Sequence, residues 1–278
     1  KSSDKDSSGI ASPGESDQPT KAEIKISGTV DGDGNVTVNM TSKTVSDAFE
    51  KALAEAKKNG NEENGISLIL NVNTGNKTAG TISVNLLKDA QDTIIAKKIV
   101  DIIVVVDNSD LRVGLDLATV KEINKQTKSD VKLSVTRRSN STLSGEARNA
   151  IGSRPVFDFQ LSYGGGEQVR DFGKGRVTIT IPYTLSVNEK AENICAVYVD
   201  ENGKVHWLFD SIYDKKEKVL RFTTSHFSTY GVGYKENSSV FTDIEGHWAK
   251  ENIECVVREG LFSGTSASTF SPNLAMTR

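Results

Sequence analysis

The hydrophobic pattern between residues 21 and 126 constrains the fold of this chain most, because it runs three times through the same order. Each round predicts two short strands with alternating apolar side chains and then an amphipathic helix. The strand-to-helix junctions read VTVNMTSKTVSDAFEKA, ISVNLLKDAQDTI and RVGLDLATVKEI. Their spacing of about 35 to 42 residues lies in the range of internal repeats. The pattern predicts either three degenerate strand-strand-helix repeats or an ordinary α+β domain in which hairpins and helices alternate.

Polar turn residues and helix-capping residues indicate where the strands and helices of each round begin and end. The two strands of each round are expected to pair as a hairpin. The first turn, DGDGN at residues 31–35, also has the spacing of a calcium loop, but Val36 and Ser42 stand where such a loop needs Gly and Glu. A plain turn is therefore favoured, and no metal site is predicted. The predicted helices cover residues 44–59, 86–97 and 116–126.

Beyond residue 131 the pattern becomes almost entirely β. A closing strand at 131–137 and a polar connection at 138–152 precede several short period-two segments with turn residues between them. Such a series is typical of an antiparallel sandwich or barrel-like domain. The predicted strands are 156–161, 177–181, 194–199, 205–209, 219–223 and 230–234.

These patterns predict a division into four parts. Residues 1–20 hold one large aliphatic side chain, Ile10, among Ser, Asp, Gly and Pro, which is too little apolar surface to offset the entropy of ordering them. They are expected to be a flexible linker. An α+β domain at 21–150, a β-rich domain at 151–236 and a separate C-terminal segment at 237–278 follow.

Charge and motif content argue against several classes of function. The chain has a net charge of -3 with both signs interspersed, and it has no dense basic stripe, so a nucleic-acid surface is not expected. No apolar run reaches the roughly 18 residues of a membrane span. The sequence holds no H-E-x-x-H, C-x-x-C, G-x-S-x-G or phosphate-loop motif. His226, with Ser225, Ser228 and Tyr230 nearby, is expected to satisfy backbone groups. We therefore predict no catalytic residue, no cofactor and no enzyme activity.

The C-terminal segment has the most specific pattern. Residues 241–278 read FTDIEGHWAKENIECVVREGLFSGTSASTFSPNLAMTR. Apolar residues at helical spacing predict one amphipathic helix at 247–259. Gly260 suits the left-handed position that ends such a helix, and Thr277 is placed to cap a second helix that begins at Arg278. Half of such a unit leaves an apolar face uncovered, so the helix is expected to pack on the β-rich domain or on another chain.

This segment resembles the S-layer homology (SLH) motif of bacterial cell-surface proteins. The matches are the F-x-D-I-x-G-H-W-A opening, the I-x-x-x-x-x-x-G-L helix end, the F-x-P turn and the final T-R. In that family three repeats form a pseudo-trimer whose grooves bind pyruvylated secondary cell-wall polymer. The resemblance implies that Arg278 meets the anionic ketal, Trp248 packs on sugar and Asp243 lies at the groove edge. Two alternatives stay open. Asp243 can cap a helix, and Trp248 can belong to a small core with Ile253, Val256 and Phe270.

A second resemblance concerns the middle of the chain. The strings VTITIPYTL, VYVDENGKV and FTTSHFSTYGVGY resemble an extracellular module found upstream of SLH repeats in Gram-positive surface proteins. It implies an internal fragment of a longer exported protein on the bacterial cell surface.

The expected function is a non-catalytic surface-display or spacer region that leads into SLH repeats, with secondary cell-wall polysaccharide as the partner of the complete repeats. Other surface proteins or polysaccharides are possible further partners. The alternative is a carbohydrate- or protein-binding accessory module of a large exported glycoside hydrolase or scaffold. Sugar binding would be favoured if Trp207, Tyr213 and Tyr183 formed one exposed aromatic face.

Overall fold

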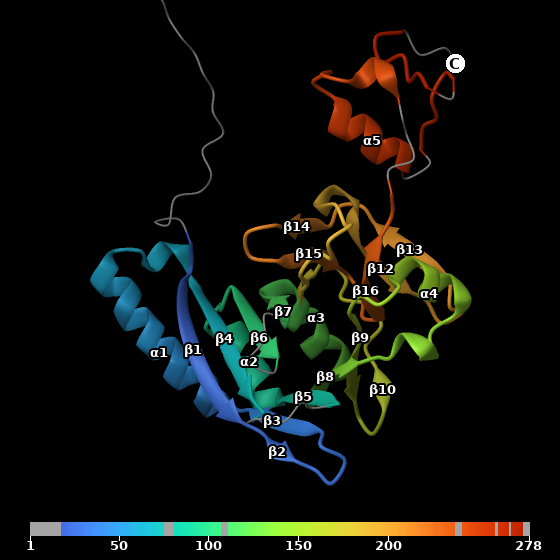
Figure 1. The fold of residues 1–278 in the computed structure, drawn as a ribbon. Coiled ribbons are helices and arrows are strands. Elements are labelled where there is room, and N and C mark those ends of the chain that lie inside the picture. Colours follow the sequence, from blue (N-terminus) through green and yellow to red (C-terminus); the bar gives the residue numbers. More distant parts are fainter. Residues whose placement is uncertain are drawn as a thin grey trace, which may run out of the picture.

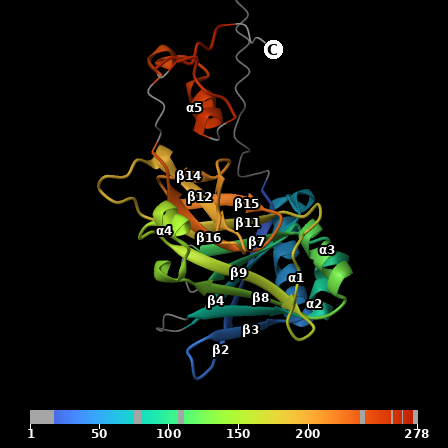
Figure 2. The same ribbon diagram turned by 90° about the vertical axis from the view of Figure 1, so that its right-hand side faces the viewer.

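The computed structural model describes residues 18–74, 80–106, 111–236, 241–258, 261–266 and 268–274. It is an α+β protein, as the sequence predicts, with most of its strands in two sheets (Figures 1 and 2). The predicted linker lies almost wholly outside the described residues, and Thr20 already begins the first strand. Residues 75–79 and 107–110, which separate the two strands of the second and third rounds, also fall outside them, and so do Gly260 and the predicted second helix after Thr277.

The elements fall into two groups, those up to the strand that follows the third long helix and those after that strand. Those up to residue 137 are β1 (Thr20–Ser27), β2 (Thr29–Val30), β3 (Val36–Met40), α1 (Ser42–Asn59), η2 (Glu62–Asn64), β4 (Ile66–Asn73), β5 (Thr81–Leu86), α2 (Lys88–Ala96), β6 (Asp101–Val106), β7 (Leu111–Asp116), α3 (Leu117–Thr127) and β8 (Val131–Arg137). The later ones are η3 (Asn140–Thr142), α4 (Gly145–Ile151), β9 (Val156–Tyr163), β10 (Glu167–Gln168), β11 (Val177–Pro182), η4 (Ala191–Asn193), β12 (Ile194–Val199), β13 (Val205–Leu208), β14 (Ile212–Asp214), β15 (Val219–Thr224), β16 (Thr229–Tyr234), η5 (Thr242–Ile244) and α5 (Lys250–Arg258).

The two sheets each contain strands from both halves of the chain. The seven-stranded sheet has the order β1-β4-β6-β7-β11-β15-β14. The nine-stranded sheet has the order β13-β12-β16-β9-β8-β5-β3-β2, and β10 pairs with β9 beside this path. All pairings that involve β9 to β16 are antiparallel.

The first two strand-strand-helix rounds have the same layout in space. The first strands β1 and β4 are parallel neighbours in the seven-stranded sheet, and the second strands β3 and β5 are parallel neighbours in the nine-stranded sheet. Helices α1, α2 and α3 lie in a row, with α2 in contact with both others. The third round keeps β6 parallel to β4 but leaves β7 in the same sheet, antiparallel to β6. This arrangement favours the repeat interpretation.

The hairpins predicted for the first two rounds are wrong. In each round the two strands enter different sheets, so β1 pairs with β4 instead of β3. The helix of each round supplies the long crossover that parallel neighbours need. The short turn at 31–35 does form, but it joins β3 to the two-residue strand β2. In that turn Asp31 accepts hydrogen bonds from the backbone N–H groups of Asp33 and Asn35.

One hydrophobic core serves both halves of the chain. Its fully buried members include Leu68 and Ile102 from the first half and Phe159, Ile179 and Tyr230 from the second. Strand β7 pairs with β11, and β8 pairs with β9, so both sheets run across the predicted boundary at residue 150. The division into 21–150 and 151–236 followed the loss of helical periodicity. The loss of helical periodicity marks the position of the last long helix. The hydrophobic core continues across the predicted boundary.

The connection at 138–152 contains a helix that the sequence analysis missed. Helix α4 is short, and Ser144 caps it by accepting a hydrogen bond from the backbone N–H of Ala147. Its buried side chains, Ala147 and Ile151, belong to a second small cluster with Val156, Val197, Val199 and Val205.

The C-terminal segment follows β16 in the chain (Figure 1) and has a small core of its own. The 3-10 turn η5 leads into α5, which begins at Lys250, three residues later than predicted. Phe241, Ile244 and Ile253 are buried together, with Ala249, Val257 and Phe270 packed against them. Among the described residues this cluster includes none from the two sheets, so the apolar face of α5 packs within its own segment and not on the core of the β-rich domain. Packing of the segment on another chain stays a prediction. No helix in the described part of the chain is long and apolar enough to cross a membrane.

Candidate functional site

The side chain of Asp243 connects the loop after α5 to the turn η5, which precedes α5. Its carboxylate accepts hydrogen bonds from the backbone N–H groups of Phe270, at 2.9 Å, and Ser271, at 2.6 Å. The bond from Phe270 is the largest cause that lowers the pKa of Asp243 from its ordinary value of 3.8, and Ser271 adds to it. The carboxylate therefore caps the F-x-P loop. The alternative role as the cap of α5 is not what the structure shows.

Close packing of aromatic rings and backbone completes this loop. The rings of Phe241 and Phe270 lie 5.6 Å apart, between centroids. Gly264 approaches Phe241 so closely that an added Cβ would overlap the ring, and the same Cβ would lie 2.6 Å from the carbonyl oxygen of Thr269. The backbone N–H of Thr242 donates to the carbonyl oxygen of Ser268 at 2.9 Å. These contacts explain why the motif needs Phe, Asp, Gly and Phe at these positions.

Trp248 lies outside this small core. Its side chain is 88% exposed, and its ring contacts His247, with 5.6 Å between centroids. The alternative that placed Trp248 in the core is therefore wrong, whereas it holds for Ile253, which is buried. No hydrogen bond or ring contact joins Trp248 to Asp243 among the described residues, and Arg278 lies outside them. The indole face is available to a ligand.

Removal of the Asp243 carboxylate is expected to release the loop. In Asp243→Ala, the amides of Phe270 and Ser271 lose their acceptor, so hydrogen exchange measured by NMR should become fast at these two positions. The wild-type loop should behave in the same way in acid. Because folding lowers the pKa of Asp243, its contribution to stability is present above the ordinary pKa and is lost as the pH falls through the folded one. Fast exchange of both amides in wild-type protein at neutral pH would contradict this role.

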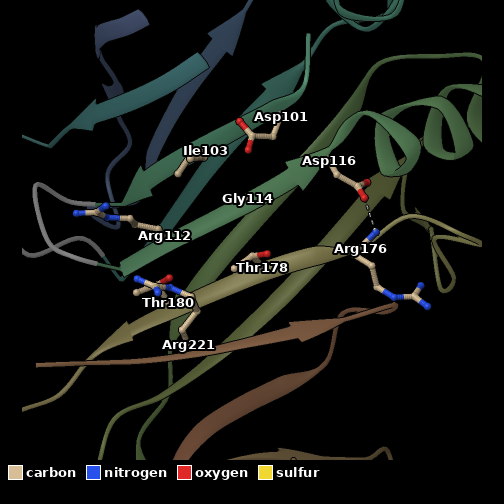
Figure 3. A pocket seen from close by; sticks show the side chains of 9 residues that line it. All are labelled: Asp101, Ile103, Arg112, Gly114, Asp116, Arg176, Thr178, Thr180 and Arg221. Atoms are coloured by element: carbon tan, nitrogen blue, oxygen red, sulfur yellow. Dashed lines mark hydrogen bonds between the residues drawn. The ribbon is translucent and has the colours of Figure 1, made fainter. Parts of the chain in front are cut away.

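A groove on the open face of the seven-stranded sheet is a second candidate site (Figure 3). Its volume is about 230 Å³. The residues that line it alternate with buried core residues along their strands, so they point away from the core. They are Asp101, Ile103, Arg112, Gly114, Asp116, Arg176, Thr178, Thr180 and Arg221.

The two carboxylates of this groove face each other across β6 and β7. Asp101 and Asp116 are register partners. Burial raises the pKa of the Asp101 carboxyl, and a hydrogen bond donated by the Ser67 hydroxyl partly offsets this effect. Asp116 accepts from the backbone N–H groups of Thr119, at 2.6 Å, and Arg176, at 3.1 Å. Asp116 therefore caps α3 and fixes the start of β11, whereas Asp101 has acceptor capacity left.

The three aromatic residues considered for sugar binding do not form one face. Trp207 lies on β13 of the nine-stranded sheet, and its ring stacks on that of Phe209 at 6.2 Å. Tyr213 lies on β14 of the other sheet and donates a hydrogen bond to the carbonyl oxygen of Tyr183 at 2.9 Å. The Tyr183 hydroxyl in turn binds Glu189. All three are only partly exposed, so they give no platform for a sugar chain.

The polar groups around His226 serve the backbone. The hydroxyl of Ser228 donates to the carbonyl oxygen of Val199 at 2.8 Å, and that of Tyr230 donates to the carbonyl oxygen of His226 at 2.9 Å. Burial lowers the pKa of His226 and so favours the neutral form of its ring. This cluster has the structural role predicted from the sequence.

Comparison with known proteins assigns the C-terminal segment. Residues 240–278 match the family model of the S-layer homology domain. The chain is also similar to an amylopullulanase of Thermoanaerobacterium thermosulfurigenes, with 28% identity over 108 residues. This similarity covers 37% of the chain, more than the SLH segment alone, and 6% of the amylopullulanase. The chain thus corresponds to a small part of that relative. Residues 240–278 therefore belong to the S-layer homology domain family, and the chain fits an SLH-containing cell-surface protein.

Proposed function

We propose that residues 18–236 are a non-catalytic surface-display or spacer region of an S-layer-associated protein, and that the SLH segment leads into its cell-wall anchor. The match of residues 240–278 to the SLH family carries this proposal. The shared core of the two sheets supports it, because a single body joined to a separately folded C-terminal unit suits a rigid part held at a surface.

Three residues of the SLH segment are proposed to act in anchoring. The exposed indole of Trp248 packs on a sugar ring of the secondary cell-wall polymer. Arg278 offers its fork of N–H donors to the anionic ketal, a geometry suited to carboxylates. Asp243 acts through the loop that it fastens, since both of its oxygens already accept backbone hydrogen bonds.

Sedimentation with purified Gram-positive cell wall that carries pyruvylated polymer tests the proposal. We expect a form extended to three complete SLH repeats to bind and the 278-residue chain to stay in solution. In the extended form, Trp248→Ala and Arg278→Ala should each weaken binding at least about tenfold, as loss of an aromatic or arginine anchor does. Ile212→Ala is the matched control, because Ile212 is 69% exposed on the sheet body. Retention of the 278-residue chain at full affinity would show that residues 18–236 bind the wall themselves.

The similarity to an amylopullulanase favours one second candidate. In that case the two-sheet body is an accessory module of a large exported glycoside hydrolase, and it binds carbohydrate or protein close to the enzyme. Affinity electrophoresis of residues 18–236 in gels that contain soluble polysaccharides separates the candidates. A spacer migrates equally in all of them, whereas an accessory module is retarded by one.

A further inference from the structure

We propose that the free edge of β1 pairs with β1 of a second copy of this chain, in antiparallel orientation, so that two seven-stranded sheets join into one continuous sheet. This interaction goes beyond the surface-display role and does not use the SLH segment. It is carried by the length of this edge strand, the direction of its backbone groups and the order of the charges along it.

β1 is the longest edge strand of the two sheets in the described part of the chain. The seven-stranded sheet ends at β1 and β14, and the nine-stranded sheet ends at β13 and β2. The other three edge strands have two to four residues, whereas β1 has eight (Figure 1). Short edge strands, bulges and prolines protect a sheet from pairing with another chain. β1 has no proline, and its register with β4 runs unbroken from Thr20 to Ser27, so it is a template for a further strand.

Every second residue of β1 directs its backbone groups toward the free edge. The N–H of Thr20 donates to the carbonyl oxygen of Gly65 at 3.0 Å, so the even-numbered residues of β1 bond to β4. The odd-numbered residues present their N–H and C=O groups to the other side, where the sheet has no further described strand. These residues are Lys21, Glu23, Lys25 and Ser27, and their side chains are exposed.

The charges on these residues favour one register with a second copy. Odd-numbered residues must lie opposite odd-numbered ones, because they carry the free backbone groups. With Ile24 at the centre, Glu23 lies opposite Lys25 of the second copy, and Lys25 lies opposite its Glu23. With Glu23 at the centre, two glutamates would face each other, and Lys21 would face Lys25. Opposite charges across a strand pair stabilise it and like charges destabilise it, so we infer the Ile24-centred register.

The apolar face of β1 supports the same register. Ile24 lies opposite Ile24 of the second copy at a position without hydrogen bonds between the two residues, where side chains of paired strands lie closest. Ile26 is only partly buried, although it packs on the hydrophobic core, and it would lie opposite the small side chain of Ala22. Pairing therefore covers apolar surface that the single chain leaves partly open.

Lysines on an edge strand often keep two sheets apart, and the order of charges on β1 avoids this effect. Glu23 stands between Lys21 and Lys25, so the strand is complementary to itself. Lys21 lies opposite Ser27 of the second copy and has Asp101 of its own chain as an electrostatic neighbour. The Ile24-centred register thus contains no pair of like charges directly opposite each other.

Sedimentation equilibrium of the whole 278-residue chain measures the association. We expect the mass to rise with concentration from 30.1 kDa toward twice this value. Glu23→Lys and Lys25→Glu should each weaken the dimer at least about tenfold, because each turns two symmetry-related pairs of opposite charges into pairs of like charges. Glu217→Lys makes the same charge change in the exposed turn between β14 and β15. It is the matched control and should dimerise as wild type does.

Two further experiments test the register and the use of the edge. The double variant with Glu23→Lys and Lys25→Glu restores both opposite-charge pairs and should dimerise as wild type does. Lys25→Pro removes an N–H from the free edge and none from the bonds to β4, so the variant should keep the fold and lose the dimer. Circular dichroism and urea denaturation check the fold of each variant.

Three results would each overturn the proposal. The first is a wild-type chain that stays monomeric at about 1 mM, where even a weak Kd would be detected. The second is a dimer that persists unchanged in Glu23→Lys, Lys25→Glu and Lys25→Pro, since such a dimer uses another surface. The third is a double variant that dimerises as weakly as the two single variants.

Discussion

A chain that ends at residue 150 is expected to be unfolded, whereas one that comprises residues 18–236 should unfold in a single cooperative transition. Truncation at 150 removes β9 to β16 and leaves β7 without β11 and β8 without β9. It also removes buried core residues from both sheets. Four large ones are Phe159, Phe222 and Tyr230 on strands and Phe172 in the loop before β11.

The magnitude follows from burial. Each large side chain contributes about 1.5 to 3 kcal/mol when it leaves water, and a whole domain is stable by only about 5 to 15 kcal/mol. Loss of these four residues alone, about 6 to 12 kcal/mol, is therefore of the same size as the total. Far-UV circular dichroism and urea denaturation of the two forms give the measurement. A cooperative transition in the 18–150 form would show that the two halves are separate domains, as the sequence alone predicted.

Local structure followed well from the sequence because it depends on local pattern. Strand β12 has the predicted bounds, and Gly60 ends α1 with a φ of 68°, in the left-handed region that suits glycine. Period two also identified the buried side of most strands. Helix α4 escaped prediction because it buries two side chains only, Ala147 and Ile151, which is too few to make a helical period visible.

Strand partners could not be derived in the same way. An alternating pattern says which side chains face the core, and it does not say which strand lies alongside. The pattern of β1 and β3 fits a hairpin as well as it fits two separate sheets. What decided the outcome is the set of crossover helices, since α1 and α2 pack against each other and bring β4 beside β1 and β5 beside β3.

The SLH segment and the groove differ in how far apart in the sequence their residues lie. The SLH segment was found because its determinants lie within 39 consecutive residues, which the family match also covers. The groove was missed because its walls come from strands between Asp101 and Arg221, which meet only through the sheet order. The available signal was Gly114, inside a strand and flanked at period two by Arg112 and Asp116, since glycine in a strand often marks a close approach.

The second large effect is expected from Gly175→Ala. Gly175 is buried in the loop before β11, where it packs on the first turn of α3. An added Cβ would lie 2.5 Å from both the backbone nitrogen and the Cα of Thr119, and closer still to its hydroxyl. Thr119 is fully buried, and its N–H is held by Asp116. Neither partner has room to move, so the overlap should cost about 3 kcal/mol.

Urea denaturation measures this cost, and Gly145→Ala provides the control. Gly145 occupies the first position of α4, and a Cβ there would meet nothing within 4 Å. Alanine at that position reduces the entropy of the unfolded chain and suits a helix, so the control should be neutral or slightly stabilising. The loop that holds Gly175 also positions the backbone N–H of Arg176, which donates a hydrogen bond to Asp116 in the groove. A denaturation midpoint equal to that of Gly145→Ala would mean that this loop does not pack on α3.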